Sequence, residues 1–159
     1  MDFGLFLQSE DTVLRQYADT VYRVAVRNTS SPQDAEDIFS QTFLIYYTKK
    51  PEFDNPEHCK AWLLRVAINL ARNIYRSRKR QTELDETLPA EETGYAQAEL
   101  SGDLEDAMKK LRPEYREVIC LFYLQELSTA EIAEVLSKNE STVRTQLQRA
   151  REQLRKILA

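Results

Sequence analysis

Glycine, proline, cysteine and histidine are all scarce in this chain, and each scarcity excludes a class of structure or site. Three glycines and five prolines in 159 residues leave little material for the tight turns of hairpins and sandwiches, so the sequence predicts an all-α protein. The chain also lacks an apolar run long enough to cross a membrane, and it does not start with the basic and apolar segments of a secretory signal. We therefore expect a cytoplasmic location.

Metal ligands and catalytic motifs are scarce too. Cys59 and Cys120 form no CxxC motif, and His58 is the single histidine. A zinc site is usually built from several such ligands, so we expect two buried or semi-buried thiols and no metal or cofactor. Neither a Gly-rich phosphate loop nor a GxSxG or HExxH motif is present. The sequence is not expected to encode an enzyme.

The N-terminal half carries three amphipathic helical patterns, over residues 9–28, 32–49 and 56–80. Ser31 before Pro32 and Asn55 before Pro56 are suited to start the second and third helices. Helical spacing of apolar residues predicts a three-helix bundle over residues 1–80. The residues expected to face inward are Val13, Leu14, Tyr17, Val21, Val24, Ala25, Ala35, Ile38, Phe39, Thr42, Phe43, Tyr46, Trp62, Val66, Leu70 and Ile74.

Composition changes after this bundle. Residues 81–105 contain eight acidic residues and no basic one, and residues 81–97 are predicted to be an acidic linker. A second small helical domain, residues 98–159, follows. Its helix after Pro113 should bury Val118, Ile119, Phe122 and Tyr123, Ser128 and Glu131 form a capping box, and Asn139 is suited to cap a last helix. The inward face of that helix is Val143, Leu147, Ala150, Leu154 and Leu158.

Residues 128–151 read as two short helices separated by a brief polar break, the pattern of a helix-turn-helix. With the apolar residues inward, the second helix presents a polar, basic face, and such side chains contact base edges and phosphates. An ordinary amphipathic helix with a solvated basic face is the alternative. The predicted duplex-binding residues are Glu140, Ser141, Arg144, Thr145, Gln148, Arg149 and Arg151.

A second basic surface lies on residues 60–80, which hold seven basic residues and no acidic one. Aromatic side chains interleaved with arginine suit unstacked bases beside a phosphate track, although positive charge also favours helix C-termini. Recurrence at intervals of three and four residues predicts one DNA-binding face. Its members are Arg72, Tyr75, Arg76 and Lys79.

The acidic residues Asp34, Glu36 and Asp37 begin the second helix, where they either complement the helix dipole or serve a partner. The formal net charge of −4 opposes the approach of DNA to the chain alone. A basic protein partner that covers an acidic face and shares the DNA resolves this conflict.

Three segments in this order resemble the extracytoplasmic-function (ECF) group of bacterial RNA polymerase sigma factors. DAEDIFSQTF (34–43) resembles the family's core-binding helix, and AWLLRVAINLARNIYRSRKR (61–80) resembles its promoter-melting helix. Its C-terminal helix-turn-helix domain is matched by LRPEYREVICLFYLQELSTAEIAEVLSKNESTVRTQLQRAREQLRKIL (111–158). The resemblance implies a non-catalytic subunit that binds core RNA polymerase through Asp34, Asp37 and Gln41.

The resemblance also implies how the subunit recognises a promoter. The third helix and the loop over residues 48–55 would capture bases of the minus-ten element, and the helix-turn-helix would read the minus-thirty-five element. An anti-sigma factor is an expected partner. Ser137, Lys138, Ser141 and Gln146 depart from the family's pattern, in which the turn reads leucine-glycine-apolar.

Two other functions remain open. A stand-alone helix-turn-helix regulator with a helical N-terminal interaction domain would account for the C-terminal half, but it leaves the basic helix over residues 60–80 without a task. An interaction protein that mimics a sigma factor would account for the altered turn.

Overall fold

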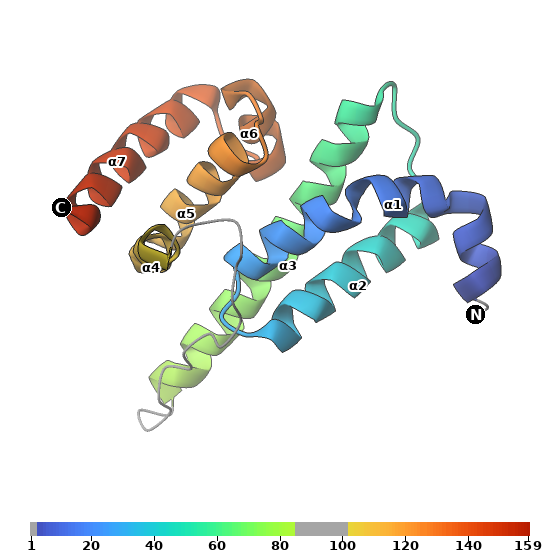
Figure 1. The fold of residues 1–159 in the computed structure, drawn as a ribbon, viewed down its shortest axis with the longest axis horizontal. Coiled ribbons are helices and arrows are strands. Elements are labelled where there is room, and N and C mark those ends of the chain that lie inside the picture. The colour runs from blue at the N-terminus through green and yellow to red at the C-terminus, as the bar shows by residue number, and fades with distance from the viewer. Residues whose placement is uncertain (1–2, 85–101) are drawn as a thin grey trace.

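The computed structural model describes residues 3–84 and 102–159, with side chains over residues 13–82 and 102–159. All regular structure in these residues is helical, as expected from the sequence. The elements are α1 (Phe3–Arg27), α2 (Pro32–Lys49), α3 (Pro56–Leu84), α4 (Gly102–Lys110), α5 (Pro113–Ile119), the π-helical turn η1 (Cys120–Leu124), α6 (Thr129–Leu136) and α7 (Glu140–Leu158). We refer to α1–α3 as the N-terminal bundle and to α4–α7 as the C-terminal bundle (Figure 1).

The predicted caps set the starts of α2 and α3. Ser31 Oγ accepts a hydrogen bond from the Asp34 backbone N–H at 3.1 Å, and Asn55 Oδ1 accepts one from the His58 N–H at 2.9 Å. Each bond satisfies a donor that the first helical turn cannot pair internally. The predicted inward faces of α1 and α2 are buried or partly buried as expected.

Helix α3 differs from the sequence-based expectation because it is buried on two sides. Its predicted inward stripe, Trp62, Val66, Leu70 and Ile74, is only partly buried, whereas Leu63 and Leu64 are both 0% exposed. Leu63 belongs to the core of the N-terminal bundle, and Leu64 belongs to the core that the C-terminal bundle forms. Three residues of the predicted stripe, Trp62, Leu70 and Ile74, do pack against the core of the N-terminal bundle. The stripe was incomplete, because α3 contacts α6 as well as α1 and α2.

The C-terminal bundle contains a second departure, at η1. The Gln125 N–H donates to the Cys120 carbonyl at 3.1 Å, a five-residue step. This π-helical turn inserts one residue into the helical register, so Cys120 and Leu121 are buried while Tyr123 is 51% exposed. The prediction that Tyr123 faces inward was therefore wrong.

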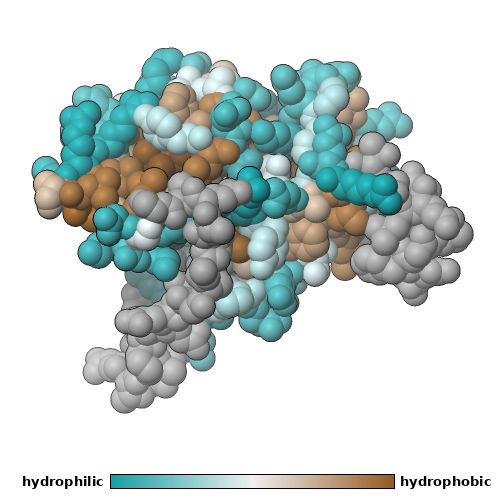
Figure 2. All heavy atoms as spheres, in the orientation of Figure 1, coloured by the Kyte–Doolittle hydropathy of each residue, from teal (hydrophilic) through white to brown (hydrophobic). Residues whose placement is uncertain are grey.

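The end of α7 also reaches beyond the core. Val143, Leu147 and Ala150 are buried as predicted, but Leu158 is 50% exposed. Figure 2 shows hydrophobic atoms gathered at the surface near the C-terminal end of α7. The prediction for Leu158 failed because the last turn of the helix has too few neighbours to cover it.

Most of the acidic linker predicted over residues 81–97 lies outside the described residues, which omit 85–101. Its first four positions, 81–84, are the last turn of α3. Helix α4 precedes the predicted start of the C-terminal helices at Pro113. None of the helices in the described ranges combines the length and apolar character needed to cross a membrane.

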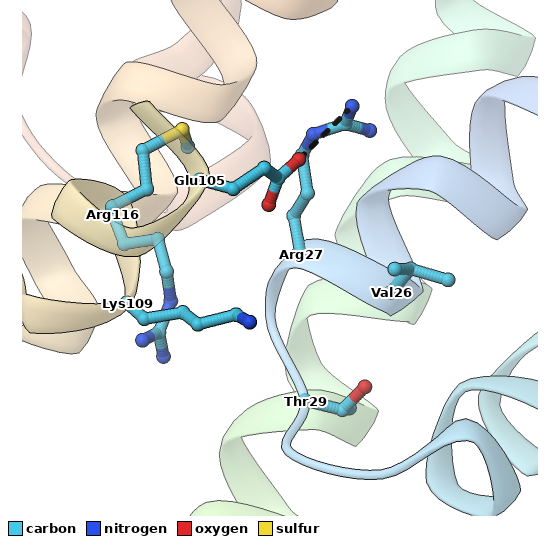
Figure 3. A pocket seen from close by; sticks show the side chains of 7 residues that line it. Val26, Arg27, Thr29, Glu105, Lys109 and Arg116 are labelled. Carbon is cyan, nitrogen blue, oxygen red and sulfur yellow. Dashed lines mark ion pairs between the residues drawn. The ribbon is translucent and has the colours of Figure 1, made fainter. Parts of the chain in front are cut away.

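The two bundles pack directly against each other. Val24 of α1, with Leu64 and Ile68 of α3, lies in the core that the C-terminal bundle forms. Polar contacts flank this apolar patch: Lys60 Nζ donates to the Gln125 carbonyl at 2.8 Å, and Arg27 pairs with Glu105 of α4 at 3.7 Å. Figure 3 shows the Arg27–Glu105 pair beside a small pocket between the end of α1 and α4.

Candidate nucleic-acid interface

The outward face of α7 carries the residues predicted to bind duplex DNA. Val143 and Leu147 face the core at 0% and 2% exposure, which fixes the opposite face toward solvent. The predicted capping box is present at the start of α6, with the Ser128 and Glu131 side chains each bonded to the other residue's backbone N–H. The exposed predicted residues on α7 are Ser141, Arg144, Thr145, Gln148 and Arg149.

Glu140 connects the two helices of the helix-turn-helix. Its Oε1 accepts a hydrogen bond from Thr129 Oγ1 of α6 at 2.7 Å and another from Arg144 Nη1 at 3.0 Å. Asn139 stands at the N-cap position as predicted, but its side chain makes no capping hydrogen bond. Thr129 was not predicted from the sequence, because its hydrogen bond to Glu140 depends on how α6 and α7 pack together.

Arg151 differs from the other predicted residues of α7. Its guanidinium lies 5.5 Å from the ring centroid of Phe122 and 5.4 Å from that of Tyr123. Its Nε also donates to the Tyr123 hydroxyl at 2.5 Å. Such cation–π contacts hold an arginine against its own bundle, so the structure groups Arg151 with η1 and apart from Arg144.

Two of the departures from the family's pattern, Lys138 and Gln146, contact each other. Lys138 Nζ donates to Gln146 Oε1 at 3.1 Å, and burial lowers the pKa of Lys138. Ser137 ends α6 in the left-handed region, with φ 56° and ψ 48°, where a glycine is favoured. The altered turn therefore keeps the usual backbone geometry and satisfies its new polar side chain.

The basic face of α3 is open along most of its length. Tyr75 is 46% exposed, and Arg76 and Lys79 are also exposed. The ring of Tyr75 therefore lies at the surface and not in the core of the bundle. Residues 72, 75, 76 and 79 follow the three- and four-residue spacing of one helix face.

Arg72 is the exception on this face, because it is engaged by the C-terminal bundle. Its Nε and Nη2 donate to the two carboxylate oxygens of Glu117 at 2.9 and 2.8 Å. The Glu117 side chain is only 7% exposed. Hydrogen bonding to Glu117 raises the pKa of Arg72. Glu117 was not predicted as a functional residue, because its partner Arg72 lies 45 residues away in the sequence.

The three residues of α2 that are predicted to bind core polymerase differ in their burial. Asp34 is 8% exposed, and its Oδ2 lies 2.7 Å from Nη2 of Arg78 on α3. Asp37 and Gln41 are exposed. Leu44, which is 51% exposed, follows Asp37 and Gln41 at helical spacing and extends their face. Leu44 was not predicted from the sequence, although its position seven residues after Asp37 is a signal that could have identified it.

The two cysteines are free and buried, which confirms the expectation of buried thiols. Burial raises the pKa of Cys120 to about 11, so its reactive thiolate is disfavoured at neutral pH.

Comparison with known proteins relates both bundles to one family. Residues 13–81 match the family model described as Sigma-70 region 2, and residues 101–154 match Sigma-70, region 4. The chain is 34% identical to the ECF RNA polymerase sigma factor SigW of Bacillus subtilis, over 89% of this chain and 84% of that protein. It is also 34% identical to the ECF RNA polymerase sigma factor SigE of Mycolicibacterium smegmatis, over 96% of this chain but only 63% of that longer protein.

A solved structure shares the fold. The sigma factor RpoE in complex with the anti-sigma factor NepR, from Bartonella quintana, aligns with a TM-score of 0.83 at 22% identity. The alignment covers 95% of this chain and 97% of that one.

Proposed function

The chain belongs to the ECF RNA polymerase sigma factors, the initiation subunits that direct RNA polymerase to promoters, and we propose how its parts divide that task. Residues 1–80 form the domain that binds core polymerase and the minus-ten element, and residues 98–159 form the domain that reads the minus-thirty-five element. Residues 81–97 link them. The observation that carries this division is the presence of two separate basic faces, on α3 and α7, in one acidic chain.

On α7, Arg144 is the principal base-reading residue. Its side chain is 60% exposed, and an arginine fork suits the O6 and N7 atoms of guanine in the major groove. Glu140 holds this arginine, and Thr129 in turn holds Glu140. Both bonds use Oε1 of Glu140, so Oε2 is the atom suited to accept from a cytosine amino group. Ser141, Thr145, Gln148 and Arg149 extend the surface to neighbouring bases and phosphates.

On α3, Tyr75 is the candidate for stacking on an unpaired base of the minus-ten element. Its exposed ring is flanked by Arg76 and Lys79, which suit the adjacent phosphates. The loop over residues 50–55, between α2 and α3, lies at the other end of α3 and is proposed to contribute to base capture.

On α2, the exposed face of Asp37, Gln41 and Leu44 is the proposed contact with core polymerase. An apolar side chain beside a carboxylate fits a partner surface that is both basic and apolar. Asp34 belongs to the same proposed contact, and its pairing with Arg78 also gives its carboxylate a structural role.

We further propose that the protein has no enzymatic activity of its own and acts in the cytoplasm, on promoter DNA. An anti-sigma factor is a proposed partner, since the related Bartonella quintana protein was solved with one.

The test is transcription in vitro with purified core polymerase and a randomised promoter library. The protein should direct initiation from a defined promoter class, which a stand-alone regulator or a sigma mimic would not do. Asp37→Arg should weaken binding to core polymerase without lowering the melting temperature, because Asp37 is exposed. Initiation no better than with core alone would contradict the proposal.

A further inference from the structure

One residue of the DNA-binding face that the sequence predicts on α3, Arg72, is bound by another residue of the protein itself. Arg72 begins the basic face that continues through Tyr75, Arg76 and Lys79, and it alone among them is bound by a residue of the C-terminal bundle. The side chain of Arg72 is 23% exposed, and that of Glu117 is 7% exposed. The contact is therefore part of the packed interface between the two bundles.

The geometry of this pair is the one that arginine uses for phosphate. Two parallel N–H donors of Arg72 meet the two oxygens of one carboxylate at 2.9 and 2.8 Å. Arginine binds carboxylates and phosphates with the same bidentate fork. Arg72 cannot offer these two donors to Glu117 and to a DNA phosphate at the same time.

Closure of the two bundles does not depend on this pair alone. Val24, Leu64 and Ile68 are at most 1% exposed, and they lie within the core of the C-terminal bundle. Burial of this apolar patch favours the closed arrangement, and the Lys60 and Arg27 contacts lie beside it. Glu117 adds an ion pair to a largely apolar interface. Whether Arg72 is bound to Glu117 therefore depends on the position of the whole C-terminal bundle.

We propose that Glu117 takes the place of a DNA phosphate at Arg72, so that closure of the two bundles and DNA binding at the start of the α3 basic face exclude each other. This inference rests on the proposed role of α3 in binding promoter DNA. Because DNA then binds only the open form at Arg72, its apparent affinity is reduced by the fraction of molecules that are open. The α7 surface is not subject to this competition, since Arg144 is held by Glu140 of its own helix.

The test measures binding of the full-length protein to a fluorescently labelled, mixed-sequence single-stranded DNA, together with small-angle scattering of the free protein. Glu117→Gln preserves the shape of the side chain and removes its charge. Glu114→Gln is the matched control, because it changes the formal charge equally on the same helix while Glu114 pairs only loosely with Arg112, at 3.9 Å. Melting curves verify that both variants are folded.

We expect Glu117→Gln to bind this DNA several-fold to about tenfold more tightly than Glu114→Gln, where tenfold corresponds to about 1.4 kcal/mol. The free Glu117→Gln protein should also be more expanded in solution. In a background of Arg72→Gln, adding Glu117→Gln should give no gain, because the glutamine at position 72 has neither the positive charge nor the guanidinium fork that binds phosphate. Equal DNA binding and equal scattering for the Glu117→Gln and Glu114→Gln variants would overturn the proposal.

A measurement on the unmodified protein keeps the proposal testable if Glu117→Gln does not fold. Saturation with the same single-stranded DNA should speed amide hydrogen exchange in η1 and α6, which pack against the N-terminal bundle. Unchanged exchange at saturation would refute mutual exclusion.

The failures of the two proposals are distinguishable. If the unmodified protein directs initiation from promoters but Glu117→Gln does not change DNA binding, only the proposed competition at Arg72 is contradicted. If Glu117→Gln changes DNA binding but the unmodified protein directs no initiation, only the proposed function is contradicted.

Discussion

The basic surfaces of α3 and α7 both carry an arginine that is paired with a glutamate, but the two arginines are held in different ways. Arg144 on α7 is fixed by Glu140 one helical turn away, and Glu140 by Thr129 of the adjacent helix. Arg72 on α3 is fixed by Glu117, which comes from the other bundle. A contact within one bundle therefore leaves a recognition surface ready to bind, whereas a contact between the bundles makes binding depend on how the bundles are arranged.

The largest effect on stability is expected from alanine substitutions at two adjacent leucines of α3, Leu63 and Leu64, which are both 0% exposed. Leu63→Ala should lower the free energy of unfolding by about 2–5 kcal/mol, because the cavity lies inside the N-terminal bundle. Leu64→Ala should lower the free energy of unfolding by less and should expand the protein, because the two bundles can separate and let water reach that site. Denaturant unfolding and small-angle scattering measure both effects. Equal destabilisation with unchanged scattering would make Leu64 an ordinary core residue.

The α7 side of the comparison is tested by Arg144→Ala. This change should cost about 1–3 kcal/mol of affinity at the preferred minus-thirty-five element and relax specificity there. Thr129→Val should have a smaller effect in the same direction, because it only releases Glu140. Binding of polymerase holoenzyme to promoter variants provides the measurement. Arg149→Ala is the control, since loss of a phosphate contact should weaken binding to all sequences alike.

The α3 side is tested by Tyr75→Ala. Loss of a base stack should cost about 1–3 kcal/mol in open-complex formation, while binding to the minus-thirty-five duplex stays the same. Permanganate footprinting reports the melted strand. Tyr75→Phe retains the ring and should retain activity. A lowered melting temperature of the free Tyr75→Ala protein would instead indicate that the ring stabilises the bundle.

The smallest effect is expected from a substitution in the turn of the helix-turn-helix that leaves both basic surfaces unchanged. Ser137 has a positive φ of 56°, which strains a residue with a Cβ atom. Ser137→Gly should stabilise the C-terminal bundle by about 0.5–1 kcal/mol. Thermal unfolding measures this, and DNA affinity should be unaltered. A lower melting temperature would show that the serine side chain contributes more than the strain it adds.

Much of the fold was predictable because its signals are local. Ser31, Asn55 and the Ser128–Glu131 capping box act within three residues of each other, so the sequence alone placed the starts of α2, α3 and α6. The apolar spacing in α7 placed Arg144 on the outward face for the same reason. These features need only the periodicity of one helix.

By itself, then, the sequence determined an all-helical chain, its helix starts, and which residue types face outward on α7. Only the tertiary structure decided which contacts those residues make. The π-helical turn moved Tyr123 to the surface, the second partner of α3 buried Leu64, and packing of the bundles brought Glu117 to Arg72. The physical reason is that contacts between residues far apart in sequence depend on the relative placement of whole helices, which helix periodicity does not specify.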